Sequence, residues 1–214
     1  MNTEKRNFDK DAALWDENPV RLKMTQDIAN TIITHIPLSS ALDVLDFGCG
    51  TGLVTFQLQP LVRSITGVDS SQGMLEMYKA KIDKLKLSNV KAALIDLDKG
   101  DKLSGEYDVI VSSMTLHHIP NIEELFKQFH AILKPGGWLG IADLDQDSGL
   151  FHKDNTGVFH YGFNRAQLRQ SLMDAGFVHV SAVDAAKTER TGKDGITRQF
   201  SIFLMSGQKD SAGY

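Results

Sequence analysis

The stretch Val44-Leu45-Asp46-Phe47-Gly48-Cys49-Gly50-Thr51-Gly52 decides the fold of this chain of 214 residues. Its first four residues are apolar apart from one acid, which is typical of a short buried strand. Three glycines at alternate positions follow, and a new apolar run begins at Leu53. Because glycine has no Cβ and can adopt a positive φ, such a loop lets the backbone approach a ligand closely. The amides of the next helix point at that ligand, so the stretch predicts a nucleotide-binding loop.

Length and composition indicate one domain over residues 1–214. The net charge is −4 and no basic run occurs, so a nucleic-acid partner is not expected. The single cysteine excludes an internal disulfide and fits a reducing compartment. The polar N-terminus does not resemble a signal peptide, and no apolar stretch is long enough for a membrane span. We therefore expect a cytoplasmic protein without a membrane partner; the sequence indicates no particular oligomeric state.

Hydrophobic periodicity outside the glycine stretch predicts alternating strands and helices. Strands are expected at about 41–47, 64–68, 90–95, 107–112, 138–144, 177–190 and 196–206. Helices are expected at about 19–36, 53–59, 71–85, 121–133 and 164–176. This alternation predicts an α/β fold with a parallel sheet covered on both faces. The last two strands form a hairpin around residues 192–195 and add one antiparallel strand.

The segment 145–163 has no clear period and is too long for a routine connection. It combines aromatic residues, Asn, Asp and the imidazoles of His152 and His160 with little aliphatic filler. That composition suits a pocket wall that encloses a small molecule and forms hydrogen bonds with it. A solvated connection is the alternative interpretation of the same segment.

The glycine spacing discriminates between two classes of nucleotide ligand. Dinucleotide-binding loops need the pattern G-x-G-x-x-G, whose third glycine would fall at position 53. Leu53 stands there, which disfavours an NAD-type oxidoreductase. Asp69 ends the second strand, where its two oxygens can accept both hydroxyls of a ribose; a helix N-terminal charge is the alternative. Asp96 and Leu97 end the third strand and can flank a purine, although Asp is also common in turns.

Taken together, these residues resemble the class I S-adenosylmethionine-dependent methyltransferases. Five stretches carry the resemblance in order: residues 44–52, residues 65–69 with Ser70 and Met74, Asp96-Leu97, residues 107–113 followed by Leu116-His117-His118, and residues 133–137. They are similar to the glycine-rich motif, the acidic motif, the adenine-contacting position, the fourth strand with its loop, and the turn before strand five. The resemblance covers nearly the whole chain. It implies a Rossmann-like, seven-stranded, mostly parallel sheet with the last strand antiparallel and helices on both faces.

The resemblance also implies S-adenosyl-L-methionine as the cofactor. The methionine part would lie along the backbone of Gly48, Cys49 and Gly50, with Asp46 orienting the loop and the cofactor's amino group. A buried acid that bonds loop amides is the alternative role for Asp46. The remaining cofactor-contacting residues are expected at the following strand ends and in an N-terminal lid and helix over residues 1–36: Asp69, Ser70, Met74, Asp96, Leu97, Ser112, Ser113, Met114 and Trp15. Trp15 can equally anchor the first helix.

Methyl transfer from a sulfonium is an in-line displacement, so the protein chiefly supplies alignment and desolvation. A general base is needed only where the acceptor must lose a proton. Candidates for that role follow the fourth and fifth strands or lie in segment 145–163: His117, His118, Asp143, His152 and His160. For His117, a capping or strand-end hydrogen bond is the alternative. No metal is expected, because the spacing of His152, Asp154 and His160 matches no standard ligand pattern.

The acceptor is expected to be a small molecule. The residues after the fourth strand lack the Asn/Asp-Pro-Pro-aromatic signature of exocyclic amine methylation, and no basic surface suggests DNA or RNA. Cys49 occupies a loop position without the Pro-Cys context of a nucleophile. A non-catalytic protein that binds S-adenosylmethionine for regulation is the alternative, followed by the NAD-type oxidoreductase.

Overall fold

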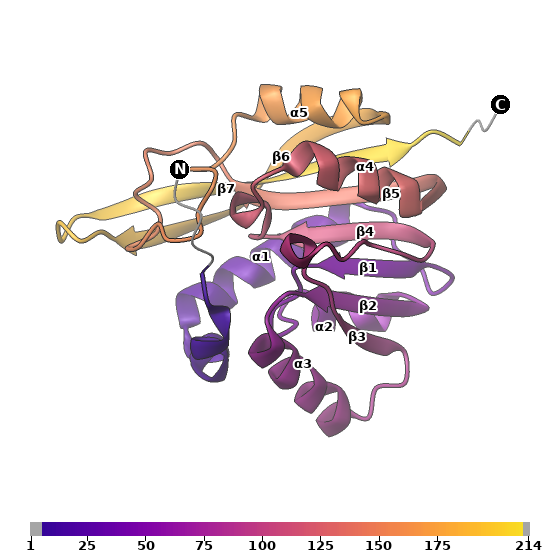
Figure 1. Cartoon of the computed structure of the whole chain (residues 1–214), viewed down its shortest axis with the longest axis horizontal. Helices are drawn as coiled ribbons and strands as arrows, with labels where there is room; N and C mark the ends of the chain where they lie inside the picture. The colour runs from indigo at the N-terminus through magenta and orange to yellow at the C-terminus, as the bar shows by residue number, and fades with distance from the viewer. Residues whose placement is uncertain (1–5, 212–214) are drawn as a thin grey trace.

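A computed structural model describes residues 6–211, and within this range seven strands form one sheet in the order β3-β2-β1-β4-β5-β7-β6 (Figure 1). The strands are β1 (Asp43–Phe47), β2 (Ser64–Asp69), β3 (Val90–Leu94), β4 (Tyr107–Ser113), β5 (Leu133–Leu144), β6 (Phe177–Thr191) and β7 (Thr197–Lys209). Neighbours from β3 to β5 pair in parallel, whereas β7 runs antiparallel to both β5 and β6. The predicted mostly parallel sheet with an antiparallel last strand is confirmed.

Helices cover both faces of the sheet (Figure 1). Within the described range they are α1 (Pro19–His35), α2 (Thr55–Leu58), α3 (Gln72–Leu85), α4 (Ile122–Ile132) and α5 (Arg165–Asp174). Short 3-10 helices also occur: η1 (Phe8–Lys10), η2 (Ala12–Glu17), η3 (Gln59–Leu61), η4 (Leu97–Lys99) and η5 (Leu116–His118). Four of these α-helices follow a residue whose side chain accepts hydrogen bonds from first-turn amides, namely Asn18, Ser71, Asn121 and Asn164. Such caps stabilise a helix start by about 1 kcal/mol.

Alternating strand residues build two separate cores. Val44 packs with the core formed by α1, α2 and α3, whereas its neighbour Leu45 packs with the core of α4 and α5. The same alternation runs along β4, where Val109 belongs to the first core and Ile110 to the second. Successive side chains of a strand point to opposite faces, so each apolar strand supplies both cores.

Some sequence-based boundaries were wrong. The four-residue spacing of Val20, Met24, Ile28, Ile32 and Ile36 predicts one buried face of α1, yet Val20 is 42% exposed. Four residues turn an α-helix by about 40° more than one full turn. Residues repeated at this spacing therefore drift around the helix, and the series does not stay on one face. The predicted turn at residues 133–137 lies inside β5, which begins directly after α4. The pairing of β5 with β4 shifts register between Tyr107 and Val109 of β4.

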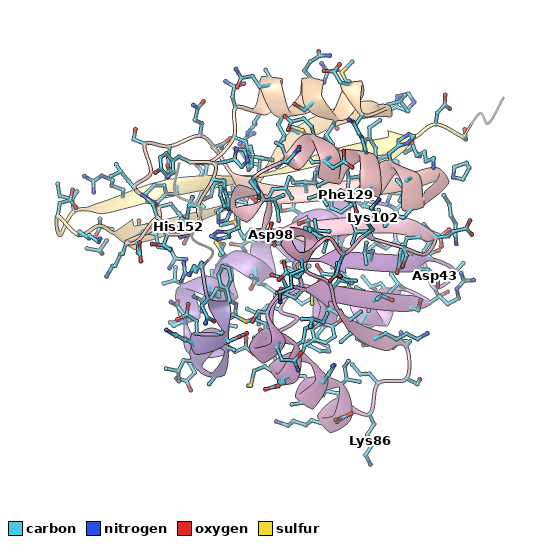
Figure 2. All side chains as sticks on the ribbon, viewed as in Figure 1. Asp43, Lys86, Asp98, Lys102, Phe129 and His152 are labelled. Carbon is cyan, nitrogen blue, oxygen red and sulfur yellow. The ribbon has the colours of Figure 1, made fainter. Side chains whose placement is uncertain are left out.

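The carboxyl ends of the parallel strands lie under two covering segments. Figure 1 shows the N-terminal segment and the loop after β5 at the same end of the sheet. In Figure 2, His152 of that loop and Asp98 after β3 lie toward this end, whereas Asp43 at the start of β1 lies at the other. No helix among residues 6–211 is long and apolar enough to cross a membrane. The single domain over 1–214 and the cytoplasmic location stay predictions.

Candidate functional site

The glycine loop after β1 needs its first two glycines for different reasons. Gly48 has a φ of 71°, and a Cβ there would lie 2.2 Å from Oγ1 of Thr115. The Thr115 hydroxyl also donates to the Gly48 carbonyl at 3.3 Å. Gly50 has a φ of 54°, but apart from its two chain neighbours no described residue has a heavy atom within 4 Å of the position that its Cβ would take. Packing within the protein therefore requires Gly48, whereas the space beside Gly50 is open.

Asp69 connects the end of β2 to the glycine loop. Its Oδ2 accepts a hydrogen bond from the Gly50 amide at 2.8 Å, and its Oδ1 accepts one from the Ser71 amide at 2.8 Å. This contact forms because β1 and β2 pair in parallel, so their carboxyl ends lie side by side. One half-buried carboxylate thereby positions both the loop and the start of α3.

Asp46 lies beneath the same loop and is almost completely buried. The Thr55 hydroxyl donates to its Oδ2 at 2.5 Å, which ties β1 to the start of α2. Burial raises the pKa of Asp46 to about 6; the Thr55 hydrogen bonds oppose that rise, and the nearby charge of Asp69 adds to it. Asp46 is thus a buried acid whose hydrogen bonds from Thr55 join β1 to α2.

The N-terminal segment contacts the glycine loop and the start of α3, and two of its carboxylates hold it there. Asp9 accepts hydrogen bonds from the Ser71 hydroxyl at 2.5 Å and from the Gly73 amide at 2.9 Å. Asp16 accepts one from the Thr51 hydroxyl of the glycine loop at 2.6 Å and pairs with Lys81 of α3. The described part of the N-terminal segment is thus bonded to the glycine loop and to the start of α3, and its role as a lid stays a prediction. Residues 1–5 lie outside the described residues.

Trp15 is half-buried in this segment. The Arg21 guanidinium lies 3.7 Å from the centre of its ring, and Phe8 contacts it edge-on at 5.9 Å between centroids. Arg21 also donates to the Trp15 carbonyl. Trp15 consequently joins η2 to the first turn of α1, and Phe8 joins it to η1.

A cavity of about 200 Å³ lies between the N-terminal segment and the ends of β2 and β3. Its walls are formed by Arg6, Asn7, Phe8, Asp9, Ser70, Ser71 and Asp96. Ser71 caps α3 by accepting a hydrogen bond from the Met74 amide at 3.2 Å, and the Met74 side chain is buried. Asp96 caps η4 and accepts from the Asp98 amide at 3.2 Å; Leu97 packs against the α4–α5 core. Of the predicted residues, Ser70 and Asp96 thus face this cavity.

The residues that end β4 have different surroundings. Ser112 is fully buried, and its hydroxyl donates to the Phe47 carbonyl at 3.0 Å, which ties β4 to β1. Ser113 and Met114 are half-buried. Met114 has a φ of 54°, and its amide donates to the Ala142 carbonyl at 2.8 Å.

Cys49 of the glycine loop is buried, and burial together with the charges of Asp46 and Asp69 raises the pKa of its thiol. A protonated thiol is a poor nucleophile.

His117 and Asp143 form a buried pair at the ends of β4 and β5. Nδ1 of His117 lies 2.7 Å from Oδ1 of Asp143, and the two side chains are 1% and 0% exposed. The Leu144 amide donates to the same oxygen at 2.7 Å. Burial opposes ionisation of Asp143, but the interactions with His117 and this amide outweigh it and lower its pKa. The carboxylate therefore fixes the orientation of the His117 ring.

Two further imidazoles surround His117, and we call His117, His118 and His152 the imidazole cluster. Ring centroids lie 4.2 Å apart for His117 and His118, 5.1 Å for His117 and His152, and 5.5 Å for His118 and His152. Nδ1 of His118 lies 2.6 Å from the Gly157 carbonyl. Burial, followed by the neighbouring His117, lowers the pKa of His118 and of His152 to about 3. Both rings are neutral at physiological pH.

The loop 145–163 folds back over the imidazole cluster. The amides of Phe159 and His160 bond the His117 carbonyl at 2.9 and 3.2 Å. At the base of the loop, Asp145 pairs with Arg165 at 2.6 Å. His160 points elsewhere, because its Nε2 lies 2.9 Å from the Ile119 carbonyl. Four of the five candidate residues are brought together, and His160 remains outside.

The sequence did not reveal several residues that build this site. Phe8 packs edge-on against His118 at 5.1 Å, and Asp9, Asp16 and Thr115 supply the hydrogen bonds described above. The polar segment before α1 has no periodicity, so its contacts could not be anticipated. Only Thr115 had a signal, since it directly precedes the Leu116-His117-His118 stretch.

Comparison with known proteins places the chain in a family. The model of the methyltransferase domain family matches residues 17–182. An uncharacterized methyltransferase of Schizosaccharomyces pombe is 36% identical in an alignment of 156 residues, and the match covers 66% of this chain and 55% of that protein. A ubiquinone biosynthesis O-methyltransferase of Coxiella burnetii is 29% identical over 165 residues, which are 77% of this chain and 65% of that protein. The chain thus spans less than two thirds of the length of these two relatives.

A solved structure with a similar fold holds the expected type of cofactor. Phosphoethanolamine N-methyltransferase 2 of Haemonchus contortus, in complex with S-adenosyl-L-methionine, superposes with a TM-score of 0.68 at 17% identity. The match covers 86% of this chain and 52% of that chain. At this identity the similarity establishes the fold.

Proposed function

Because the chain belongs to the methyltransferase domain family, of the class I S-adenosylmethionine-dependent type, we propose that it transfers a methyl group from S-adenosylmethionine to a small-molecule acceptor. The observation that carries this proposal is the convergence of two groups at one edge of the sheet. Asp69 bonds Gly50 at the ends of β2 and β1, and His117 pairs with Asp143 at the ends of β4 and β5. Ligands of open α/β sheets bind outside the carboxyl ends of the strands.

The first group suits the cofactor. Each Asp69 oxygen already accepts one amide hydrogen bond and has further lone pairs for the ribose hydroxyls. Asp96 in the cavity wall would accept from the exocyclic amine of adenine, with Leu97 beside the ring. The methionine part would lie along residues 48–50, where the space beside Gly50 is open. These assignments agree with the roles expected from the sequence.

The N-terminal segment supports the proposal because it would exclude water from the reaction. It bonds both the start of α3, through Asp9, and the glycine loop, through Asp16. Its Phe8 reaches the imidazole cluster by packing on His118. A segment that touches both groups would close over cofactor and acceptor together.

The second group suits an acceptor with an ionisable O–H or S–H group. In the reaction, the acceptor's oxygen or sulfur would attack the methyl carbon and form a new bond to it. The bond from that carbon to the sulfonium sulfur would break, and its electron pair would stay on sulfur. Nε2 of His117, whose Nδ1 donates to Asp143, would accept the proton that the acceptor loses. The relative from Coxiella burnetii is named an O-methyltransferase, which supports an oxygen acceptor.

Calorimetry with S-adenosylmethionine, its demethylated product and NAD tests cofactor identity. We expect heat with both sulfur nucleosides and none with NAD; the opposite pattern would overturn the proposal. Methyl incorporation from labelled cofactor into separate metabolite, nucleic-acid and protein fractions then tests the acceptor. Label in the metabolite fraction is expected, and label confined to protein or nucleic acid would contradict a small-molecule acceptor. Cofactor binding without label in any fraction would favour the non-catalytic alternative.

A further inference from the structure

The imidazole cluster has the composition and spacing of a metal-ligand set. One ring nitrogen of each of His117, His118 and His152 lies within 4.8 Å of those of the other two. The first two histidines belong to the tight turn η5, and the third comes from the loop after β5. The large sequence separation between His118 and His152 hides this group in the sequence, and only the fold assembles it.

In His117 and His118 the hydrogen bond is made at Nδ1, so Nε2 of each ring is available to coordinate an ion. A carbonyl oxygen can only accept, so Nδ1 of His118 donates to Gly157 and its Nε2 carries a lone pair. The Asp143 carboxylate holds Nδ1 of His117 in the same way. Metal-ligating histidines typically donate their other ring N–H to a carboxylate or a backbone carbonyl, and both versions occur here.

The third ring supplies an independent observation. Nε2 of His152 is buried and has no hydrogen-bond partner among the residues that the structure describes. Buried polar atoms in proteins nearly always have a partner, and leaving one without costs free energy. An ion bound beside His117 and His118 would give this nitrogen its partner.

We propose that His117, His118 and His152 bind one divalent transition-metal ion of the zinc type. Three protein ligands with a fourth position left open are typical of catalytic rather than structural zinc. Zn–N bonds of about 2.0–2.1 Å place the nitrogens of a tetrahedral site roughly 3.4 Å apart, so each pair would close by at most about 1.4 Å. The rings that must approach already lie in contact. Imidazole ligands also suit copper and nickel.

The role of the ion rests on the proposed function. The acceptor's hydroxyl or thiol would occupy the open position, where a bound cation lowers the pKa of a coordinated group. With the ring nitrogens bound to the ion, the proton would pass to solvent instead of to His117. The coordinated oxygen or sulfur would keep the electron pair with which it attacks the methyl carbon. The sulfonium sulfur would leave with the electrons of the broken bond as an uncharged thioether. The ion would undergo no redox change.

Zinc titration of the chelator-treated full chain tests the site. We expect one zinc ion per chain, a zinc affinity that falls at least tenfold in His152→Ala, and a similar loss in Asp143→Asn. His160→Ala is the matched control, because His160 shares the loop but bonds the Ile119 carbonyl. Its zinc affinity should stay within about twofold. Cobalt should produce the absorption of a tetrahedral site in the wild type and in His160→Ala, but not in His152→Ala.

The outcomes separate this inference from the proposed function. Less than one tenth of a zinc ion per chain, or equal zinc affinity in wild type and His152→Ala, would overturn the metal site. Circular dichroism and S-adenosylmethionine calorimetry on the same samples show whether each variant is folded. Full methyl transfer by zinc-free protein would overturn the catalytic role alone. Stoichiometric zinc without any S-adenosylmethionine binding would sink the proposed function and leave the metal site standing.

Discussion

Nδ1 of His117 lies 2.7 Å from Oδ1 of Asp143, and this contact joins the turn after β4 to the end of β5 in the interior of the protein. The carboxylate can only accept, so Nδ1 carries the hydrogen and Nε2 has the lone pair. The same Asp143 oxygen accepts the Leu144 amide, which fixes the carboxylate itself. The pair therefore orients one imidazole nitrogen for an acceptor or for an ion.

Replacing Asp143 by Asn should impair acceptor use more than cofactor binding. Asn can present its amide N–H to Nδ1, which would reverse the His117 tautomer. We expect kcat/KM for methyl transfer to fall by about 10²-fold, with the S-adenosylmethionine affinity within about threefold of wild type. Labelled-methyl transfer and calorimetry measure the two effects, and nitrogen chemical shifts report the tautomer. Asp83→Asn on the exposed face of α3 is the control. A parallel loss of cofactor affinity would point to a purely structural role.

Asp69→Ala should weaken S-adenosylmethionine binding by about 2–4 kcal/mol, the value of a lost pair of charge-assisted hydrogen bonds. Part of this loss would come through Gly50 and Ser71, whose amides lose their acceptor. Calorimetry measures the affinity, with Asp83→Ala as the control. Unchanged affinity in Asp69→Ala would refute the ribose assignment.

Alanine at Gly48 and at Gly50 should have different effects. Gly48→Ala adds a clash with Thr115 to the cost of a positive φ and should lower the free energy of unfolding by about 2–3 kcal/mol. Gly50→Ala should lower it by only about 1–2 kcal/mol, because its Cβ meets open space, but should weaken S-adenosylmethionine binding. Urea unfolding and calorimetry measure both quantities. Gly100→Ala, which also has a positive φ and open surroundings, calibrates the backbone cost alone. Tight cofactor binding by Gly50→Ala would place the ligand elsewhere.

Asp46 should make the protein less stable as pH rises from about 4 to about 6. Its pKa in the folded protein is about 6, above the ordinary 3.8, so the folded state holds a proton that the unfolded state has released. The resulting loss is complete above pH 6 and amounts to about 3 kcal/mol at most. Asp46→Asn should remove this decline, because Asn stays neutral and can still accept from Thr55.

Urea unfolding of wild type and Asp46→Asn at pH 4.5 and pH 7.5 measures that difference. The advantage of Asp46→Asn should be larger at pH 7.5, while its S-adenosylmethionine affinity should fall if the carboxylate also orients the cofactor's amino group. Parallel stability curves for the two proteins would show that Asp46 does not titrate in this range.

The order of strands and helices followed from local sequence patterns. Periodicity and turn signals act over a few residues, so the glycine stretch and the terminal hairpin could be recognised without the fold. Asp69 could be placed beside the glycine loop because parallel strands end at a common edge. The errors, such as Val20, arose where a regular spacing was extended beyond one face of a helix.

By itself, the sequence determined the α/β architecture, the mostly parallel sheet and the family, because each depends on short-range spacing. Only the tertiary structure decided which histidines meet. His117 and His118 lie far from His152 in the chain, and no local pattern encodes a contact made by a loop that folds back through Gly157 and Phe159. It also decided that Gly48 serves packing while Gly50 faces open space, since both residues look alike until Thr115 is placed beside one of them.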